Sequence, residues 1–266
     1  MRKPGIKARI RESNMTKERS PFTPGRPVPV EFFVGRLLEI DRMVRSVRQV
    51  AQGKQENLFL AGERGIGKSS LAAFVRYLAE KDHAFLAVHV YLGGSSTLPE
   101  VVQRTFERLL QESASKPFFS KIKSLFADHV KEVGLFGVTL QFSLGQGEGR
   151  NLVTNFLPAL DRLFDRISDE KKGIMLVLDD INGVTANPQF AHFLKSIVDE
   201  IATRHRPLPL LLLLTGLPER RVLDNFLVRM RKLGVLRPGE RRGEYVFVNN
   251  LFRLYMTLQA AGGAIG

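Results

Sequence analysis

The chain has 266 residues, of which 44% are hydrophobic, and this is enough for one α/β domain with a buried core. The absence of cysteine excludes disulfides, thiolate metal ligands and a cysteine nucleophile, and it suits a reducing cytoplasm, where we expect the protein. The formal net charge is +13, and most of it lies at the ends, because residues 1–26 hold eight Lys or Arg against two acids and residues 219–266 hold nine against four.

Basic ends of this kind attract polyanions, DNA above all, because each neutralised phosphate releases counterions. A solvated, solubilising tail explains residues 1–26 equally well. The longest apolar run, residues 208–214, is far shorter than the ~20 residues that a membrane-spanning helix needs. We therefore expect no membrane contact.

The first part of the chain predicts an arm followed by a helix and a strand. Residues 1–30 contain five prolines and almost no aliphatic periodicity, so we expect a basic irregular arm. Apolar residues at helical spacing from Leu37 to Val47 predict a helix that ends at Gly53. The apolar run at 57–61 predicts a buried strand.

The loop after this strand carries the most specific signal in the chain. It matches the pattern Gly, four free positions, Gly, Lys, Ser or Thr, and it precedes a predicted helix at 71–78. Glycines let backbone N–H groups point at phosphate oxygens at the positive end of that helix. We predict a nucleotide triphosphate site, for which the alternative is a glycine-rich turn that caps a helix. Its residues are Gly62, Glu63, Arg64, Gly65, Ile66, Gly67, Lys68, Ser69 and Ser70.

Two side chains of this loop have individual chemical roles in the prediction. Lys68 adds a positive charge for the outer phosphates. The Ser69 hydroxyl is a candidate ligand for Mg²⁺. The pattern therefore implies a nucleotide triphosphate and magnesium as cofactors.

Downstream of the loop, the chain alternates between strand and helix patterns. Thr97 or Ser96 is placed to cap the helix that follows the second strand. The alternating residues near 140 indicate a strand or half-hairpin, which we interpret as an insertion. The expected elements are a strand at 84–92, helices at 99–110 and 116–133, a strand at 138–144 and a helix at about 152–167.

A second informative run ends in two acids. Residues 174–178 predict a strand buried on both faces, and Asp179 and Asp180 follow at its carboxyl end, where open parallel sheets bind ligands. In phosphate-loop enzymes the first such acid supports the magnesium ion and the second orients or deprotonates the attacking water. Asp179 is therefore the candidate metal residue and Asp180 the candidate catalytic residue. An acidic turn after a strand is the alternative.

Thr215 ends another predicted strand, residues 208–214, after a helix over about 188–204. From the strand next to the acidic one, its hydroxyl is placed to reach the γ-phosphate or the water. The alternative is a strand-ending hydroxyl that bonds nearby backbone.

Four segments follow one another in a characteristic order. They are Phe33-Val34-Gly35-Arg36, the phosphate loop, residues 174–180 and residues 214–219. In this order they resemble the AAA+ ATPases, over residues 31–219. The nearest branch is the archaeal and bacterial ATPases related to origin-recognition initiators, which borders on the STAND signalling ATPases. The resemblance implies a P-loop NTPase fold, an α/β protein of three αβα layers with a mainly parallel sheet and ATP as the nucleotide.

The resemblance also implies residue roles. Val34, Gly35 and Arg36 would lie beside the adenine, and Thr215 would sense the γ-phosphate. One departure is Asp180, because fast AAA+ hydrolases have Glu there and Asp is shorter by one methylene. STAND-like members share Asp at this position and act as slow switches, so the resemblance implies slow hydrolysis.

A larger departure follows Glu219, where relatives continue with a helical lid and then a winged-helix domain. Residues 220–266 instead predict a helix at 222–233, a hairpin at 236–248 and a last helix from Leu251. This order is similar to the final part of a winged helix. We expect the lid to be missing, which would leave the nucleotide open on one side and lower affinity and turnover.

The basic residues of this segment have two interpretations each. Arg220 and Arg221 either reach the nucleotide of a neighbouring subunit or are plain surface charge. Six others either contact DNA phosphates or belong to a packing remnant. They are Arg229, Arg231, Lys232, Arg237, Arg241 and Arg242.

Three hypotheses of function result. The leading one is ATP binding with slow Mg²⁺-dependent hydrolysis. The alternative is a nucleotide-gated DNA-binding or signalling protein with negligible catalysis, and a third is a degenerate ATPase fragment that folds but does little. The oligomeric state and the partner stay open at this point.

Overall fold

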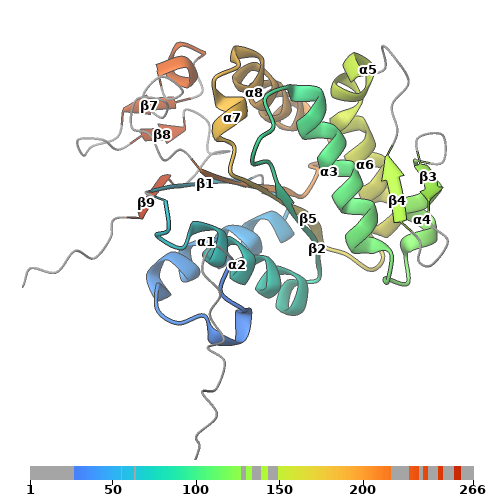
Figure 1. The fold of residues 1–266 in the computed structure, drawn as a ribbon, viewed down its shortest axis with the longest axis horizontal. Helices are drawn as coiled ribbons and strands as arrows, with labels where there is room; N and C mark the ends of the chain where they lie inside the picture. Colours follow the sequence, from blue (N-terminus) through green and yellow to red (C-terminus); the bar gives the residue numbers. More distant parts are fainter. Residues whose placement is uncertain are drawn as a thin grey trace, which may run out of the picture.

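The computed structural model shows a parallel sheet with helices on both faces (Figure 1). It describes residues 27–54, 56–62, 64–126, 130–133, 139–142, 149–216, 228–233, 236–238, 245–247 and 255–258. The strands of the main sheet are β1 (Glu56–Gly62), β2 (Phe85–Tyr91), β5 (Gly173–Asp179), β6 (Leu210–Gly216) and β9 (Tyr255–Leu258). All pairs are parallel, in the order β2-β5-β6-β1-β9.

Two helical layers cover the sheet, one on each face. Figure 1 shows α1 (Leu37–Ala51) and α2 (Lys68–His83) below it and α3 (Leu98–Ser113), α6 (Phe156–Ile167) and α8 (Pro188–Thr203) above it. This arrangement confirms the predicted α/β fold of three αβα layers. The shorter helices are η1 (Val30–Phe32), α4 (Phe119–Lys123), α5 (Gly149–Thr154) and α7 (Asn182–Thr185).

Strand alternation divides the core into two apolar clusters. Since successive side chains of a strand point to opposite faces, Met175 and Val177 pack under α1 and α2 while Ile174 and Leu176 pack under α3, α6 and α8. The five leucines of β6 divide in the same way, which explains why this strand is apolar on both faces. Asp179 comes two residues after Val177 and therefore lies on the same face of the sheet. This is the face covered by α2, the helix that follows the phosphate loop.

Local sequence explains where the helices begin. Gly67 stands at the N-cap of α2 with φ 91°, a conformation that glycine adopts without steric cost. Thr97 caps α3, its side chain accepting the Glu100 N–H while the Glu100 carboxylate accepts the Thr97 N–H, with Pro99 in the first turn. The predicted capping role of Thr97 is confirmed.

One predicted helix, over residues 116–133, is wrong in its second half. The helix α4 ends at Lys123, and β3 (Val130–Val133) pairs antiparallel with β4 (Thr139–Phe142). The physical reason is that pairing with β4 supplies backbone hydrogen bonds to an extended segment, and this outweighs weak helical spacing. The strand predicted near residue 140 is confirmed as one arm of this hairpin.

The last part of the chain also differs from its prediction. Residues 228–232 are helical, and β7 (Leu236–Pro238) pairs antiparallel with β8 (Tyr245–Phe247), so the predicted hairpin is confirmed. The helix predicted from Leu251 is wrong at β9, which pairs in parallel with β1. The outer edge of β1 offers backbone groups that an extended segment satisfies and a helix does not.

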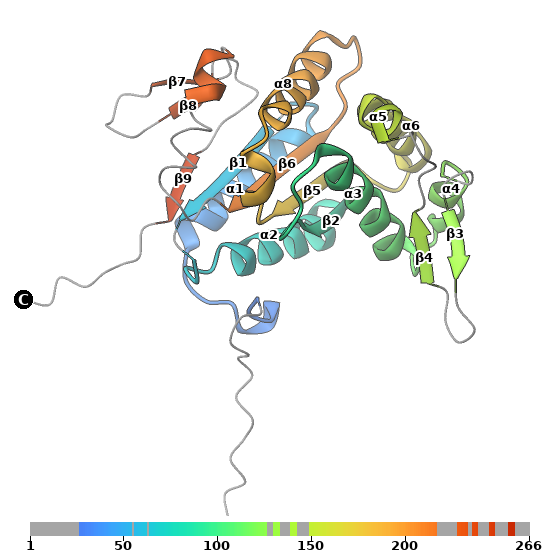
Figure 2. The same cartoon turned by 45° about the horizontal axis from the view of Figure 1, so that its top comes forward.

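The two small hairpins lie at opposite ends of the molecule in both views (Figures 1 and 2). The hairpin β7–β8 lies on the side of β1 and β9, and β3–β4 lies beyond α3. Several predicted features fall outside the described residues, and the partial winged helix of residues 220–266 stays a prediction. These features are the arm at 1–26, Glu63, Arg220, Arg221, Arg241 and Arg242.

Candidate functional site

The glycine loop joins β1 to α2 at the carboxyl end of the sheet. Gly65 and Gly67 both have positive φ, 83° and 91°, and a Cβ built at either position would meet nothing within 4 Å. Backbone conformation therefore selects glycine here, and the space in front of the loop stays open. The Lys68 ammonium donates to the Gly62 carbonyl, with Nζ and O 2.8 Å apart, so the side chain folds back over the loop.

The carboxylate of Asp179 is the centre of a buried hydrogen-bond network. Its Oδ1 accepts a hydrogen bond from Ser69 Oγ at 3.1 Å and another from the Thr215 hydroxyl. Its Oδ2 lies 3.0 Å from His89 Nε2. The side chains of Asp179, Thr215 and His89 are buried, so three strands and one helix terminus converge on one carboxylate. The structure thus brings together Ser69, Asp179 and Thr215, which are far apart in the sequence.

Burial and two nearby acids act in opposite directions on the pKa of Lys68. Partial burial lowers the pKa of Lys68, and the charges of Asp179 and Asp180 act in the opposite direction without cancelling that effect. For Asp179, burial acts to raise the pKa, but hydrogen bonds from His89, Thr215 and Ser69 outweigh it and hold the pKa below its ordinary value. The site therefore keeps an ionised carboxylate opposite a lysine.

Asp180 joins this network through its backbone, and its carboxylate bonds elsewhere. Its backbone is left-handed with φ 60°, and its N–H donates to Thr215 Oγ1 at 3.4 Å. Its carboxylate accepts a hydrogen bond from the Asn182 side chain. On the other side lies Gly93, where a Cβ would stand 3.1 Å from Asp180 Oδ2. Asp180 is thus exposed, and its carboxylate is bonded to the side chain of Asn182, two residues later in the same turn.

The segment before α1 lies against the phosphate loop. Arg36 donates from Nη2 to the carbonyl of Ile66 at 2.6 Å, and its own backbone is left-handed with φ 53°. The N–H of Val28 donates to Ser70 Oγ at 3.0 Å, and this second hydrogen bond joins the same segment to the first turn of α2. Arg36 thus contacts the phosphate loop, and its place beside the adenine stays a prediction.

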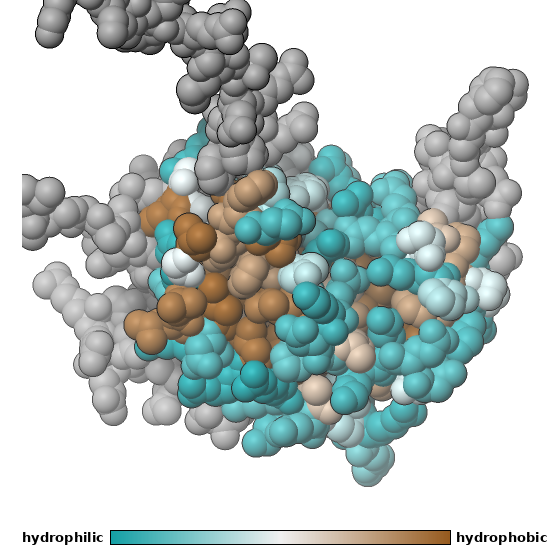
Figure 3. Space-filling model, turned by 90° about the horizontal axis from the view of Figure 1, so that it is seen from below, coloured by the Kyte–Doolittle hydropathy of each residue, from teal (hydrophilic) through white to brown (hydrophobic). Residues whose placement is uncertain are grey.

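Apolar side chains beside this contact are exposed. Val34 is 86% exposed and Leu37 78%, and Leu38 in the next position is 75% exposed. Figure 3 shows apolar residues gathered on the side of the molecule that carries α1 and α2. Exposed aliphatic surface of this kind is suited to a flat apolar ligand.

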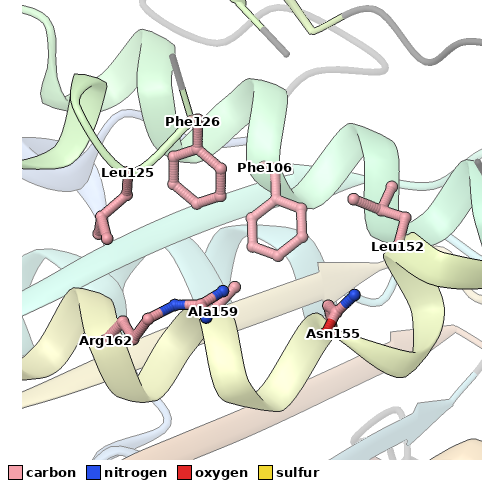
Figure 4. Close-up of a pocket in the computed structure, with 7 residues that line it drawn as sticks. All are labelled: Phe106, Leu125, Phe126, Leu152, Asn155, Ala159 and Arg162. Atoms are coloured by element: carbon pink, nitrogen blue, oxygen red, sulfur yellow. The ribbon is translucent and has the colours of Figure 1, made fainter. Parts of the chain in front are cut away.

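A cavity of about 260 Å³ lies elsewhere, between α3, α5 and α6 (Figure 4). None of the predicted site residues lines it. Its walls are aromatic and aliphatic, with the amide of the N-cap residue of α6 and one guanidinium from α6 itself. The lining residues are Phe106, Leu125, Phe126, Leu152, Asn155, Ala159 and Arg162.

Sequence reasoning missed two polar residues of the site, His89 and Asn182. His89 belongs to a strand that was predicted, and its position two residues before Tyr91 places both on one face. Only the register of β2 against β5 shows that this face is the one that carries Asp179. A polar residue inside an otherwise apolar strand was the available signal.

The fold and the loop together define the class of protein. A parallel sheet whose first strand runs through a glycine loop into a helix, with an acid at the end of β5 and one strand, β6, between the two, is the P-loop NTPase arrangement. The chain matches the AAA ATPase domain family over residues 33–218 and belongs to that family. A search of curated proteins found no match.

Several solved structures resemble this chain. The ORC2 protein of Aeropyrum pernix, in ADPNP and ADP complexes, has 17% identity and a TM-score of 0.48, with 81% of this chain and 48% of that chain covered. The ORC1 protein of Aeropyrum pernix in complex with DNA has 17% identity and a TM-score of 0.41, with 75% and 43% covered. Drosophila ORC bound to DNA and Cdc6 has 12% identity and a TM-score of 0.43, with 73% and 27% covered.

The chain spans less than half the length of each of these proteins. Membership of the AAA ATPase domain family rests on the match over residues 33–218. Among the described residues, the helices are too short or too polar for any of them to span a lipid bilayer.

Proposed function

We propose that the protein binds ATP and hydrolyses it slowly with Mg²⁺. The observation that carries the proposal is the hydrogen bond from Ser69 Oγ to Asp179 Oδ1, with Lys68 beside the same carboxylate. A hydroxyl and a carboxylate are oxygen ligands that Mg²⁺ prefers, and they meet where the loop N–H groups and Lys68 favour phosphate. Membership of the AAA ATPase domain family supports the same assignment.

The residues of the loop fit a triphosphate. Positive φ at Gly65 and Gly67 together with open space at both positions leaves the backbone accessible to a large anion. Ser69 and Asp179 would hold Mg²⁺, which when bound neutralises phosphate charge. The Lys68 ammonium would exchange its hydrogen bond to the Gly62 carbonyl for one to a phosphate oxygen.

The adenine would cover the exposed apolar residues next to the loop. Val34 and Leu37 offer aliphatic surface, and Arg36 holds the segment against the Ile66 carbonyl. Gly35, with φ 84°, permits the turn that presents this surface. Packing of a flat base against aliphatic side chains is the usual basis of such sites.

Two features support slow rather than fast hydrolysis. The Asp180 carboxylate bonds to Asn182 in its own turn, so this acid must leave that contact before it orients water. The Thr215 hydroxyl donates its hydrogen bond to Asp179 Oδ1, so it can contact the γ-phosphate only after that bond breaks. Both rearrangements would precede the chemical step.

Lys68→Ala tests ATP binding directly. The substitution removes the charge that faces the outer phosphates, and contacts of this kind contribute roughly 1.5–3 kcal/mol each, so we expect a loss of at least about tenfold in affinity by calorimetry. Lys54→Ala, at an exposed lysine outside the site, is the matched control. Equal affinity of wild type and Lys68→Ala would refute the proposal.

Asp180→Asn separates binding from turnover. The amide keeps the size of the side chain and loses its basicity, so ATP affinity should stay at the wild-type value while single-turnover hydrolysis stops. Hydrolysis that is unchanged in this variant would remove Asp180 from the catalytic role.

The alternative function is a nucleotide-gated DNA-binding or signalling protein with negligible catalysis. The positive charge of residues 1–26 and 219–266 favours DNA as the partner. We place the protein in the cytoplasm. Tight ATP binding with phosphate release at the background rate would select this alternative. A steep fall of duplex DNA affinity with salt, lost when the basic arm is removed, would identify DNA as the target.

A further inference from the structure

His89 is a buried polar residue in the middle of an apolar strand. It lies in β2, only 3% exposed, and its Nε2 is 3.0 Å from Asp179 Oδ2. In the register of β2 and β5, His89 lies opposite Val177 and Tyr91 lies opposite Asp179, so the contact is a diagonal one on the face toward α2. The imidazole therefore reaches the carboxylate from the strand on the far side from Thr215.

The two oxygens of the Asp179 carboxylate are bonded differently. Oδ1 accepts from Ser69 and Thr215, whereas Oδ2 meets the imidazole of His89. An ionised carboxylate oxygen can only accept a hydrogen bond, so Nε2 of His89 is the donor to Oδ2. Occupying Oδ2 in this way fixes the rotation of the carboxylate and leaves Oδ1 turned to the Ser69 hydroxyl.

One contact holds the His89 ring and another holds its backbone. The ring of Tyr91 stacks on that of His89 with centroids 4.4 Å apart and planes 17° from parallel. Arg108 Nε, in α3, donates to the backbone carbonyl of His89 at 3.2 Å and pairs with Glu112 at 2.9 Å. A ring packed in this way does not reorient without disturbing β2, so it acts as a fixed donor.

We propose that His89 is a positioning residue that aligns Asp179 for Mg²⁺ and so sets the magnesium affinity of the ATP-bound protein. This inference rests on the proposed function, in which Ser69 and Asp179 hold the ion. Partners that orient a metal-binding carboxylate typically change metal affinity by about 10- to 100-fold when they are removed. His89 would act through Asp179 and touch neither the ion nor the nucleotide.

The test is a magnesium titration of ATP binding in wild type and three variants. His89→Leu keeps an apolar side chain of similar size and loses the donor, whereas His89→Gln places an amide N–H near the position of Nε2. His192→Gln, at an exposed histidine of α8, is the control. Calorimetry would measure ATP affinity first in EDTA and then at increasing free Mg²⁺, and thermal unfolding would report on the fold.

We expect all of these proteins to bind ATP equally in EDTA. The half-saturating Mg²⁺ concentration should rise at least about tenfold in His89→Leu and return to within about threefold of wild type in His89→Gln. An unchanged magnesium dependence in a folded His89→Leu would overturn the role of His89 and leave the proposed function standing.

Two further outcomes would also overturn it. Loss of ATP binding in EDTA by His89→Leu would mean that His89 supports the whole site rather than the metal. Failure of wild type to bind ATP in either condition would overturn the proposed function and this inference together.

If His89→Leu does not fold, a comparison of His89→Gln with His89→Asn replaces it, because the amide of Asn is shorter and reaches only the position of Nδ1.

Discussion

Removing the hydroxyl of Thr215 tests the Asp179 network without touching the phosphate loop. Thr215 is fully buried, donates to Asp179 Oδ1 and accepts the Asp180 N–H at 3.4 Å. Thr215→Val keeps the shape of the side chain and removes both bonds. A hydrogen bond to a charged group contributes about 1.5–3 kcal/mol, so we expect a loss of this size in the free energy of unfolding. For a domain of this size, 2 kcal/mol corresponds to a fall in Tm of roughly 4–8 °C.

The pH dependence of this loss identifies its cause. The folded-state pKa of Asp179 is lowered, so its ionised form contributes stability that is present above the ordinary Asp value of 3.8 and is lost as the pH falls through the folded-state pKa. Thr215→Val removes one hydrogen bond that lowers this pKa. The difference between wild type and variant should therefore be largest at neutral pH and shrink in acid.

Urea unfolding at neutral pH and at several acidic values would measure this difference. Thr215→Ser is the matched control, because it keeps the hydroxyl and loses only a methyl group, and its smaller loss should not change with pH. A loss in Thr215→Val that is the same at every pH, or one equal to that of Thr215→Ser, would refute the assignment of the bond to the ionised carboxylate.

Two further predictions concern the elements that support the site. Thr97→Ala removes the cap of α3, and the free energy of unfolding measured by urea denaturation should fall by about 1 kcal/mol, whereas a loss near zero would mean that the capping box contributes nothing. Gly183→Ala would place a Cβ 2.3 Å from the carbonyl oxygen of Ser95, so α7 must move. We expect this variant to lose roughly 1–3 kcal/mol in the same assay, and an unchanged midpoint would contradict the close packing of α7 on the loop after β2.

Several features of the site could be predicted because their signals are local. The glycine loop needs a fixed spacing of residues in one turn, and Lys68 and Ser69 belong to the same pattern. The acid pair follows directly from a run of apolar residues that predicts a buried strand. Such features depend on backbone conformation and on the next few residues, so they can be recognised in a single chain.

Features that depend on pairing between distant segments could not be predicted. Val130–Val133 and Tyr255–Leu258 carry weak local preferences, and each is a strand because a partner strand accepts its backbone bonds. Asp180 directly follows β5, as the sequence predicts, but its left-handed backbone and its bond to Asn182 depend on the turn after that strand.

The amino-acid sequence by itself determined the class of fold and the loop that the proposal assigns to phosphate, because short-range spacing specifies both. It also determined that an acid ends the strand beside Thr215. Tertiary structure alone decided that His89 meets Asp179, since the register of β2 against β5 selects which side chains share a face. That register results from the packing of whole layers, and no short stretch of the chain contains it.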